Sequence, residues 1–245
     1  MPSQDGKSKM PEPLIQFSKV NKKYGHIHAL KDVSVTFDKG EFISIFGPNG
    51  AGKSTFLKLL CTMTSPSSGE IKYEGIPLKK LKDDFRSRFG VISHQPFLYS
   101  ELTAMENLRF YANLYGVKNI DERIKELMSK VELYKRRNDK VRGYSRGMLQ
   151  RLSITRALLH SPDIVVLDEP YTGLDTHASS ILTNILTELF DNNHTIIMVT
   201  HNIKQGYDAS SRLGIIKGGK LVFNDQTANT SMEDFEQVYT EAVSG

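Results

Sequence analysis

The 245-residue sequence has no tryptophan and a single cysteine, Cys61. One thiol cannot form an internal disulfide, so the sequence lies outside the disulfide-rich secreted class and fits a reducing cytoplasm. It also lacks any apolar run approaching the roughly 20 residues of a membrane-spanning helix. The longest runs, at 164–167 and 196–199, have the length of strands. We therefore expect a chain that does not cross a bilayer by itself.

The N-terminal segment is poor in apolar side chains as well. Residues 1–13 are polar, are interrupted by Pro2, Pro11 and Pro13, and lack the apolar core of a signal peptide. We predict a disordered lead-in over 1–13, followed by a single domain over 14–245.

Charge is nearly balanced, with 32 basic and 28 acidic residues and a net charge of +4. Basic residues gather at 79–88 and 135–142, but neither cluster is interleaved with aromatics in the manner of a single-strand nucleic-acid surface. We interpret the balance as a slightly basic soluble surface and predict no nucleic-acid partner. Contact with an anionic membrane face is the alternative.

Hydrophobic patterning predicts strands first and helices next. Strands are expected in the first third, at 14–20, 33–37, 41–46 and around 71–73. Helices are expected at 104–115 and 121–134, where apolar residues recur at helical spacing. Both helices fall within a helical segment of about 96–160.

The last third alternates between the two element types. An apolar run from Ile164, a helix at 178–190 and a second apolar run at 195–200 predict a parallel βαβ unit with buried strands. Glycines 218–219 are expected to turn a late hairpin, and Ser231 to open a final amphipathic helix.

A glycine-rich segment lies between a strand that ends at Phe46 and an apolar helix at 56–63. In such a loop glycines let successive backbone N–H groups turn inward, and the helix N-terminus adds positive potential. We predict that this loop binds ATP, with Lys53 on the β- and γ-phosphates and Ser54 on Mg²⁺. The predicted ATP-binding residues are Gly47, Pro48, Asn49, Gly50, Ala51, Gly52, Lys53, Ser54 and Thr55.

Two carboxylates, Asp168 and Glu169, end the apolar run that starts at Ile164. Ligands bind at the carboxyl ends of parallel strands, so this edge should face the phosphate loop. We predict that Asp168 holds Mg²⁺, directly or through water, and that Glu169 polarises the attacking water as a general base. His201, at the end of the next strand, is expected to donate a hydrogen bond to the γ-phosphate.

These motifs, in this order, resemble the nucleotide-binding subunits of ABC transporters over nearly the whole chain, from about Leu14. The resemblance implies an α/β fold: a P-loop NTPase core with a parallel sheet, an N-terminal antiparallel β-subdomain and an inserted α-helical subdomain. It implies that Tyr24 stacks on adenine and that Gln95 touches Mg²⁺ and the lytic water. It also places Asp175 in a loop, 173–175, that crosses to a partner subunit.

The family signature departs from its usual form. Most members read Leu-Ser-Gly-Gly-Gln, whereas residues 144–148 read Tyr-Ser-Arg-Gly-Met. Ser145 and Gly147 are retained, which implies that a hydroxyl, a backbone N–H and a helix dipole face the γ-phosphate of the opposite subunit. Arg146 replaces a glycine and Met148 loses a polar contact, so how closely the backbone approaches there is open.

The resemblance implies an ATP hydrolase that dimerises on ATP with a second ABC ATPase subunit, a homodimer being favoured over a heterodimer. It implies work at the cytoplasmic face of the membrane through an integral membrane permease subunit. We expect an active site because Glu169 and His201 are present.

Export is favoured, with a lean, on motif likeness, towards haem export and cytochrome c maturation over multidrug-type ATPases. The alternatives are a soluble ABC-type ATPase acting on DNA, ribosomes or iron–sulfur assembly, and a P-loop kinase. A long coiled-coil insertion and a second ATPase domain, which mark DNA-repair and ribosome-acting members, are absent from the sequence.

Overall fold

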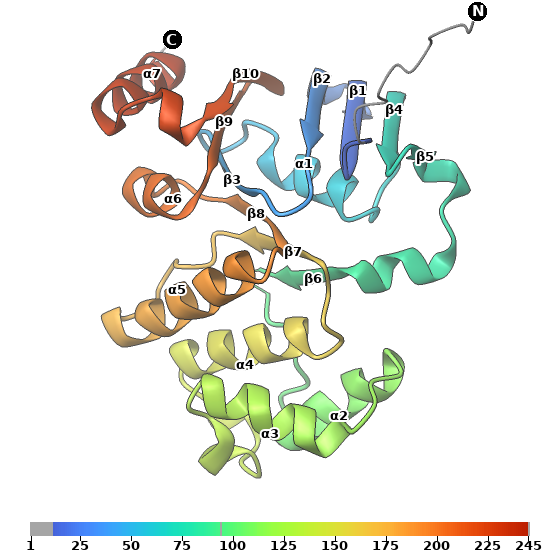
Figure 1. The fold of residues 1–245 in the computed structure, drawn as a ribbon, viewed down its shortest axis with the longest axis vertical. Coiled ribbons are helices and arrows are strands. Elements are labelled where there is room, and N and C mark those ends of the chain that lie inside the picture. Colours follow the sequence, from blue (N-terminus) through green and yellow to red (C-terminus); the bar gives the residue numbers. More distant parts are fainter. Residues whose placement is uncertain (1–11, 94, 245) are drawn as a thin grey trace, which may run out of the picture.

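The computed structural model describes residues 12–93 and 95–244, so most of the predicted lead-in over 1–13 lies outside the described residues. The described chain contains two β-sheets with helices packed on and between them (Figure 1). The smaller sheet is antiparallel and has the order β2-β1-β4-β5. Its strands are β1 (Ile15–Tyr24), β2 (Ile27–Phe37), β4 (Ser68–Tyr73) and β5 (Ile76–Pro77).

The larger sheet has the order β10-β9-β3-β8-β7-β6. Strands β9, β3, β8, β7 and β6 pair in parallel, and β10 pairs antiparallel with β9. The strands are β3 (Phe42–Phe46), β6 (Phe89–Ile92), β7 (Ile164–Asp168), β8 (Thr195–Val199), β9 (Arg212–Lys217) and β10 (Lys220–Gln226). The predicted α/β class, with a parallel core sheet and an antiparallel β-subdomain, is therefore confirmed.

Seven α-helices are described in residues 12–93 and 95–244. They are α1 (Lys53–Leu60), α2 (Ala104–Leu114), α3 (Ile120–Lys130), α4 (Arg146–Leu158), α5 (Thr176–Asp191), α6 (Ile203–Ala209) and α7 (Met232–Ser244). Short 3-10 turns lie at Leu78–Lys80, Asp83–Arg88, Tyr134–Arg136, Val141–Gly143 and Thr227–Asn229. The parallel pairing of β7 with β8, with α5 between them in sequence, confirms the predicted βαβ unit. None of these helices combines the length and apolarity needed to cross a membrane.

Helix ends differ from the pattern-based prediction where local caps decide them. The prediction of one helix over 121–134 is wrong at its end, because α3 stops at Lys130 and Glu132 adopts a left-handed φ of 57°. Helix α4 begins at Arg146, where the Ser145 side chain accepts a hydrogen bond from the Met148 N–H and caps the helix. The strand β6 and the helix α6 were not predicted.

Helix α1 lies between the two sheets and joins their cores. Phe56 packs against Phe17 and Phe37 of the small sheet, with ring centroids 5.2 and 6.1 Å apart. The same buried cluster contains Ile43 and Ile45 of β3. Burial on both sides therefore fixes the start of α1 relative to β3, which is where the glycine-rich loop lies.

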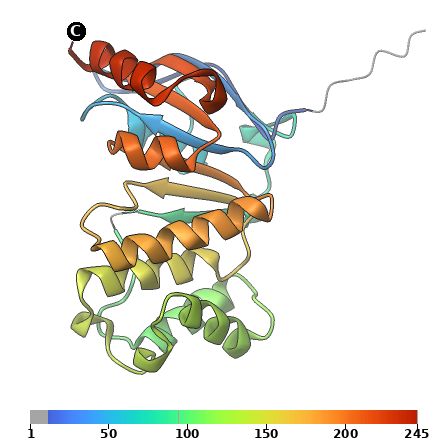
Figure 2. The same cartoon turned by 60° about the vertical axis from the view of Figure 1, so that its left-hand side comes forward.

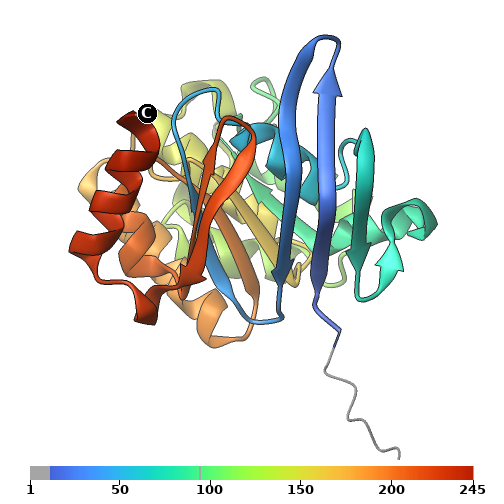
Figure 3. The same cartoon turned by 90° about the horizontal axis from the view of Figure 1, so that it is seen from above.

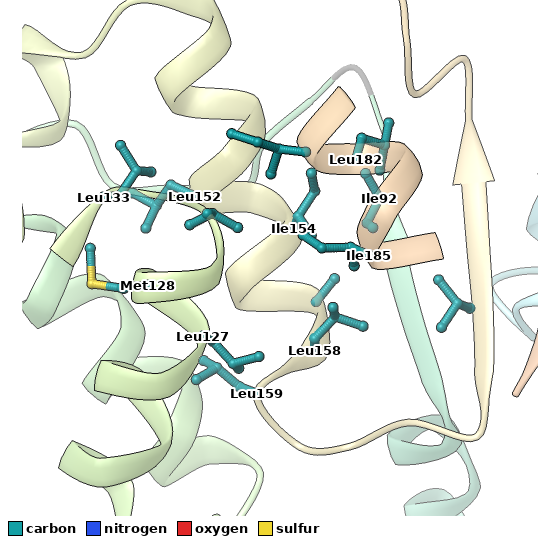
Figure 4. Close-up of a cluster of buried hydrophobic side chains, with 14 of the residues drawn as sticks. Ile92, Leu127, Met128, Leu133, Leu152, Ile154, Leu158, Leu159, Leu182 and Ile185 are labelled. Atoms are coloured by element: carbon teal, nitrogen blue, oxygen red, sulfur yellow. The ribbon is translucent and has the colours of Figure 1, made fainter. Parts of the chain in front are cut away.

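The opposite face of the large sheet is covered by α4 and α5, which lie side by side (Figure 2). Leu152 and Ile154 of α4 pack with Leu182 of α5 and Ile92 of β6, and α3 adds Met128 (Figure 4). Helices α2, α3 and α4 fall within the predicted helical segment of about 96–160, whose status as a separate subdomain stays a prediction.

Helix α7 packs on the edge of the large sheet through a small aromatic cluster. Phe235 is fully buried, and its ring centroid lies 5.0 Å from that of Phe46, the last residue before the glycine-rich loop. The helix begins as predicted, because the Ser231 hydroxyl accepts a hydrogen bond from the Asp234 N–H at 3.1 Å. The C-terminal helix thus supports the end of β3.

Phe235→Ala should destabilise the fold, because removing a fully buried aromatic ring leaves a cavity beside Phe46. We expect the free energy of unfolding, measured in urea, to fall by about 3 to 5 kcal/mol. Val243→Ala, at an exposed position of the same helix, should change it by less than about 0.5 kcal/mol. Similar losses for the two variants would contradict the role given to this cluster.

Candidate nucleotide site

The glycine-rich loop runs from the end of β3 to the start of α1, and neighbouring backbone crowds two of its glycines. Gly47 has φ 153°, and a Cβ on it would lie 2.2 Å from the Ile216 carbonyl oxygen. Gly52 has φ 109°, and a Cβ on it would lie 2.5 Å from the Ala29 carbonyl oxygen. Any larger residue would clash with backbone at both positions, so glycine lets the loop approach β9 and β2 this closely.

Lys53 is the first residue of α1, and its side chain is 9% exposed. Its Nζ donates hydrogen bonds to the carbonyl oxygens of Gly47 at 2.7 Å and Pro48 at 3.1 Å. The ammonium therefore folds back onto the first two residues of the loop. Burial lowers the pKa of Lys53 below its ordinary value, while the carboxylates of Glu169 and Asp168 act in the opposite direction. An anionic ligand in the loop would favour the charged form further.

A cavity of about 490 Å³ opens over this loop. It is lined by loop residues 49–55, by Asp168 and Glu169, by β2 residues 27–29 and 31, and by 218–219. The structure therefore brings the predicted phosphate loop and the predicted acidic pair to one cavity. A cavity of this volume is large enough for a cofactor-sized ligand.

Asp168 ends β7, and Glu169 follows it with a left-handed φ of 51°. This turn aims the Glu169 side chain at the end of β8. There its Oε2 accepts hydrogen bonds from His201, at 2.7 Å from Nδ1 and 3.3 Å from the backbone N–H. His201, Asp168 and Glu169 thus stand together at the carboxyl ends of adjacent parallel strands, as the sequence predicts.

Other predicted site residues lie outside this cavity. Tyr24 does not line it; the residue is 45% exposed, and the Lys22 ammonium lies 5.0 Å from the centroid of its ring. Gln95 is exposed, and its backbone carbonyl accepts a hydrogen bond from the Ser93 hydroxyl at 2.9 Å. The adenine-stacking role of Tyr24 and the metal and water role of Gln95 remain predictions.

The signature segment and the loop 173–175 also lie outside the cavity. Ser145 is exposed and caps α4, and Arg146, Gly147 and Met148 form the first turn of that helix. Asp175 caps α5 by accepting a hydrogen bond from the Ala178 N–H at 2.8 Å. Within one chain these residues therefore form no part of the cavity wall over the predicted phosphate loop.

Part of the cavity wall was not predicted from the sequence. The turn at 218–219 braces the loop, since Gly219 donates from its N–H to the Ala51 carbonyl at 2.9 Å and accepts from the Lys31 N–H at 2.8 Å. This contact places the β9–β10 hairpin beside the β1–β2 hairpin (Figure 3). Two glycines between strands indicate a turn and carry no signal for a ligand site.

The residues at the cavity fit a hydrated magnesium ion. The Ser54 hydroxyl and the Asp168 carboxylate both line the cavity and supply hard oxygen ligands. Mg²⁺ is commonly held by one or two such groups together with substrate phosphates and water. No cluster of three or more His, Cys, Asp or Glu side chains that could hold a metal occurs in residues 12–93 and 95–244. Burial also raises the pKa of the Cys61 thiol to about 12, which keeps it protonated and unsuited to metal binding.

The chain is similar in sequence to known proteins. The ABC transporter family model matches residues 30–172. The ABC transporter ATP-binding protein NatA of Bacillus subtilis is 35% identical over 200 residues, which cover 80% of this chain and 81% of NatA. The macrolide export ATP-binding/permease protein MacB of Mannheimia succiniciproducens is 35% identical over 225 residues, which cover 87% of this chain and 35% of MacB.

A solved structure extends the likeness to three dimensions. It is the dimeric, post-hydrolysis state of the ATP-binding cassette MJ0796 bound to ADP and Pi, with a TM-score of 0.78 and 29% sequence identity. The match covers 87% of this chain and 98% of that one. On the family model and these relatives, the chain belongs to the ABC transporter family, as an ATP-binding domain of that family.

Proposed function

We propose that this protein is the ATP-hydrolysing subunit of an ABC exporter and that it drives a separate membrane subunit. The observation that carries the proposal is that Lys53, Asp168 and Glu169 all line one cavity at the carboxyl edge of the parallel sheet. A phosphate loop, a metal-binding carboxylate and a candidate general base are the groups that hydrolysis of a nucleoside triphosphate needs.

In this mechanism the chain's own groups bind and orient the triphosphate. The amides of residues 49–55 and the N-terminus of α1 surround the phosphates. The Lys53 ammonium, now held by two carbonyls, turns to the β- and γ-phosphates. Ser54 and Asp168 would hold Mg²⁺, which neutralises phosphate charge when bound.

Glu169 takes a proton from the attacking water in this scheme. The hydrogen bond between its Oε2 and His201 Nδ1 holds the carboxylate at the edge of the cavity. It also fixes one ring nitrogen of His201, so the other is available to the γ-phosphate. The site therefore requires the ends of both β7 and β8, because Glu169 follows the first strand and His201 follows the second.

Sealing of the cavity is assigned to a second subunit. Ser145 and Gly147 lie outside the chain's own cavity, so they can complete a site only across an interface. The dimeric state of the MJ0796 cassette with ADP and Pi supports this arrangement. We propose that two chains close on two ATP molecules, exclude water from the phosphates and reopen after hydrolysis.

The names of the relatives support a membrane partner and export as the direction of transport. MacB is named as an ATP-binding and permease protein and as an exporter, and this chain matches the part that covers 35% of it. We therefore propose a permease partner at the cytoplasmic face of a membrane. The lean towards haem and cytochrome c cargo gains no support from the names of these relatives.

Glu169→Gln should remove the general base while keeping the shape of the side chain. We expect ATP turnover to fall by about 100-fold or more, while ATP-dependent dimers accumulate in gel filtration because the nucleotide is bound and not cleaved. Glu122→Gln, on the exposed first turn of α3, is the matched control and should behave as the unchanged chain. Undiminished turnover by Glu169→Gln would refute the assigned base.

Removal of divalent cations tests the assigned metal ligands. Chelation should abolish hydrolysis, and added Mg²⁺ should restore it. Asp168→Asn should shift the magnesium concentration for half-maximal turnover upward by about ten-fold or more, because a ligand charge is lost. Asp191→Asn, at the exposed end of α5, serves as control. Equal magnesium requirements in the two variants would exclude Asp168 as a ligand.

A further inference from the structure

Arg146, which stands where the family signature usually has a glycine, contacts the loop that follows the acidic pair of its own chain. Its guanidinium lies against Gly173, so that a Cβ on Gly173 would be 2.4 Å from the Arg146 Cζ and 2.7 Å from its Nε. Gly173 itself has a left-handed φ of 75°. The absence of a side chain at 173 therefore creates the surface on which this arginine rests.

Two further contacts join the same helix to the same segment. The Gln150 Nε2 donates a hydrogen bond to the Pro170 carbonyl at 3.2 Å. A Cβ on Gly147 would lie 3.8 Å from the Ala178 Cβ, so the backbones of α4 and α5 are close there. The first turns of α4 are thus attached to residues 170–178 at successive points along the helix.

The segment that joins these contacts to Glu169 is short and internally braced. Thr172 donates from its N–H to the Glu169 carbonyl at 3.1 Å, and Leu174 donates to the Tyr171 carbonyl at 3.2 Å. Asp175 then caps α5. Because these two hydrogen bonds close consecutive tight turns, we expect a displacement of Gly173 to move the backbone of Glu169 as well.

Charge pairing does not explain the position of Arg146. The residue is exposed, and its guanidinium forms no hydrogen bond or ion pair within residues 12–93 and 95–244. It also opens a helix whose first turn holds no acidic side chain, where a cation is disfavoured by the helix dipole. Its packing on Gly173 is the contact that relates it to the catalytic segment.

We propose that Arg146 is a positioning residue that couples the two ATP sites of the dimer. It ties the signature segment, which seals the partner's nucleotide, to the loop that carries the chain's own Glu169. Closure of the signature on one nucleotide would then set the general base at the other. The proposal rests on the proposed function, because it requires the head-to-tail dimer. The competing role is direct contact of Arg146 with the partner's phosphates.

Mixed dimers separate the two roles. Two copies of the full chain with different tags are co-expressed and purified in tandem, one of them carrying Glu169→Gln, so that a single site in the dimer turns over. Arg146→Met is placed either on the chain with intact Glu169 or on the Glu169→Gln chain. In the first arrangement the active nucleotide is sealed by an unaltered signature, and in the second by the altered one.

If Arg146 acts within its own chain, the first arrangement loses more turnover than the second. We expect kcat to be about ten-fold lower in the first arrangement than in the second. The KM for ATP in the first arrangement should stay within about two-fold of the mixed dimer without the arginine change, because the lost contact positions a base and binds no substrate. Equal losses, or a larger loss in the second arrangement, would overturn the proposal.

Two variants guard against a folding artefact. Arg142→Met removes another exposed arginine of the same region, one that pairs with Glu101 at 3.3 Å, and should leave kcat unchanged in both arrangements. Arg146→Lys keeps charge and length but loses the planar group that lies on Gly173, and it should reproduce the difference between arrangements at smaller size. An unaltered dimer, with Glu169 intact in both chains, that hydrolyses no ATP would instead refute the proposed function.

Discussion

The close approach of the loop 47–52 to two neighbouring strands is the constraint on which the site depends. Gly47 lies against β9 and Gly52 against β2, each at a distance that excludes a side chain. With the backbone so placed, Lys53 enters α1 already buried and directed at the loop carbonyls. The ammonium is held in a desolvated position that an anion would relieve, which fits the proposed role of the loop in phosphate binding.

Two hydrophobic layers keep that loop opposite the acidic pair. One face of the large sheet packs on α1 and the antiparallel sheet, and the other packs on α4 and α5. Consecutive residues of β7, such as Val165 and Val166, enter opposite layers, so the strand is fixed from both sides. Its carboxyl end then delivers Asp168 and Glu169 to a defined place, where His201 of the neighbouring strand end meets the glutamate.

The sequence pattern predicted those elements whose conformation depends on nearby residues. The strand ending at Phe46, the turn at 218–219 and the helix opened by Ser231 were all predicted, because each depends on periodicity or on a turn or cap residue. The strand β6 escaped prediction, since it is short and contains Gly90, and pairing with β7 decides its conformation. The end of α3 was misplaced because apolar spacing continues through Val131 into a turn.

The sequence by itself determined which residue types meet at the site, because the loop at 47–55, the carboxylates Asp168 and Glu169, and His201 all belong to local motifs at the ends of apolar strands. Only the tertiary structure decided what surrounds them. Packing of the antiparallel sheet and the turn after β9 brought residues 27–29, 31 and 218–219 to the cavity, and helix packing placed Arg146 against Gly173. These neighbours are far apart along the chain, and their proximity arises from burial of separate apolar faces, which no local pattern records.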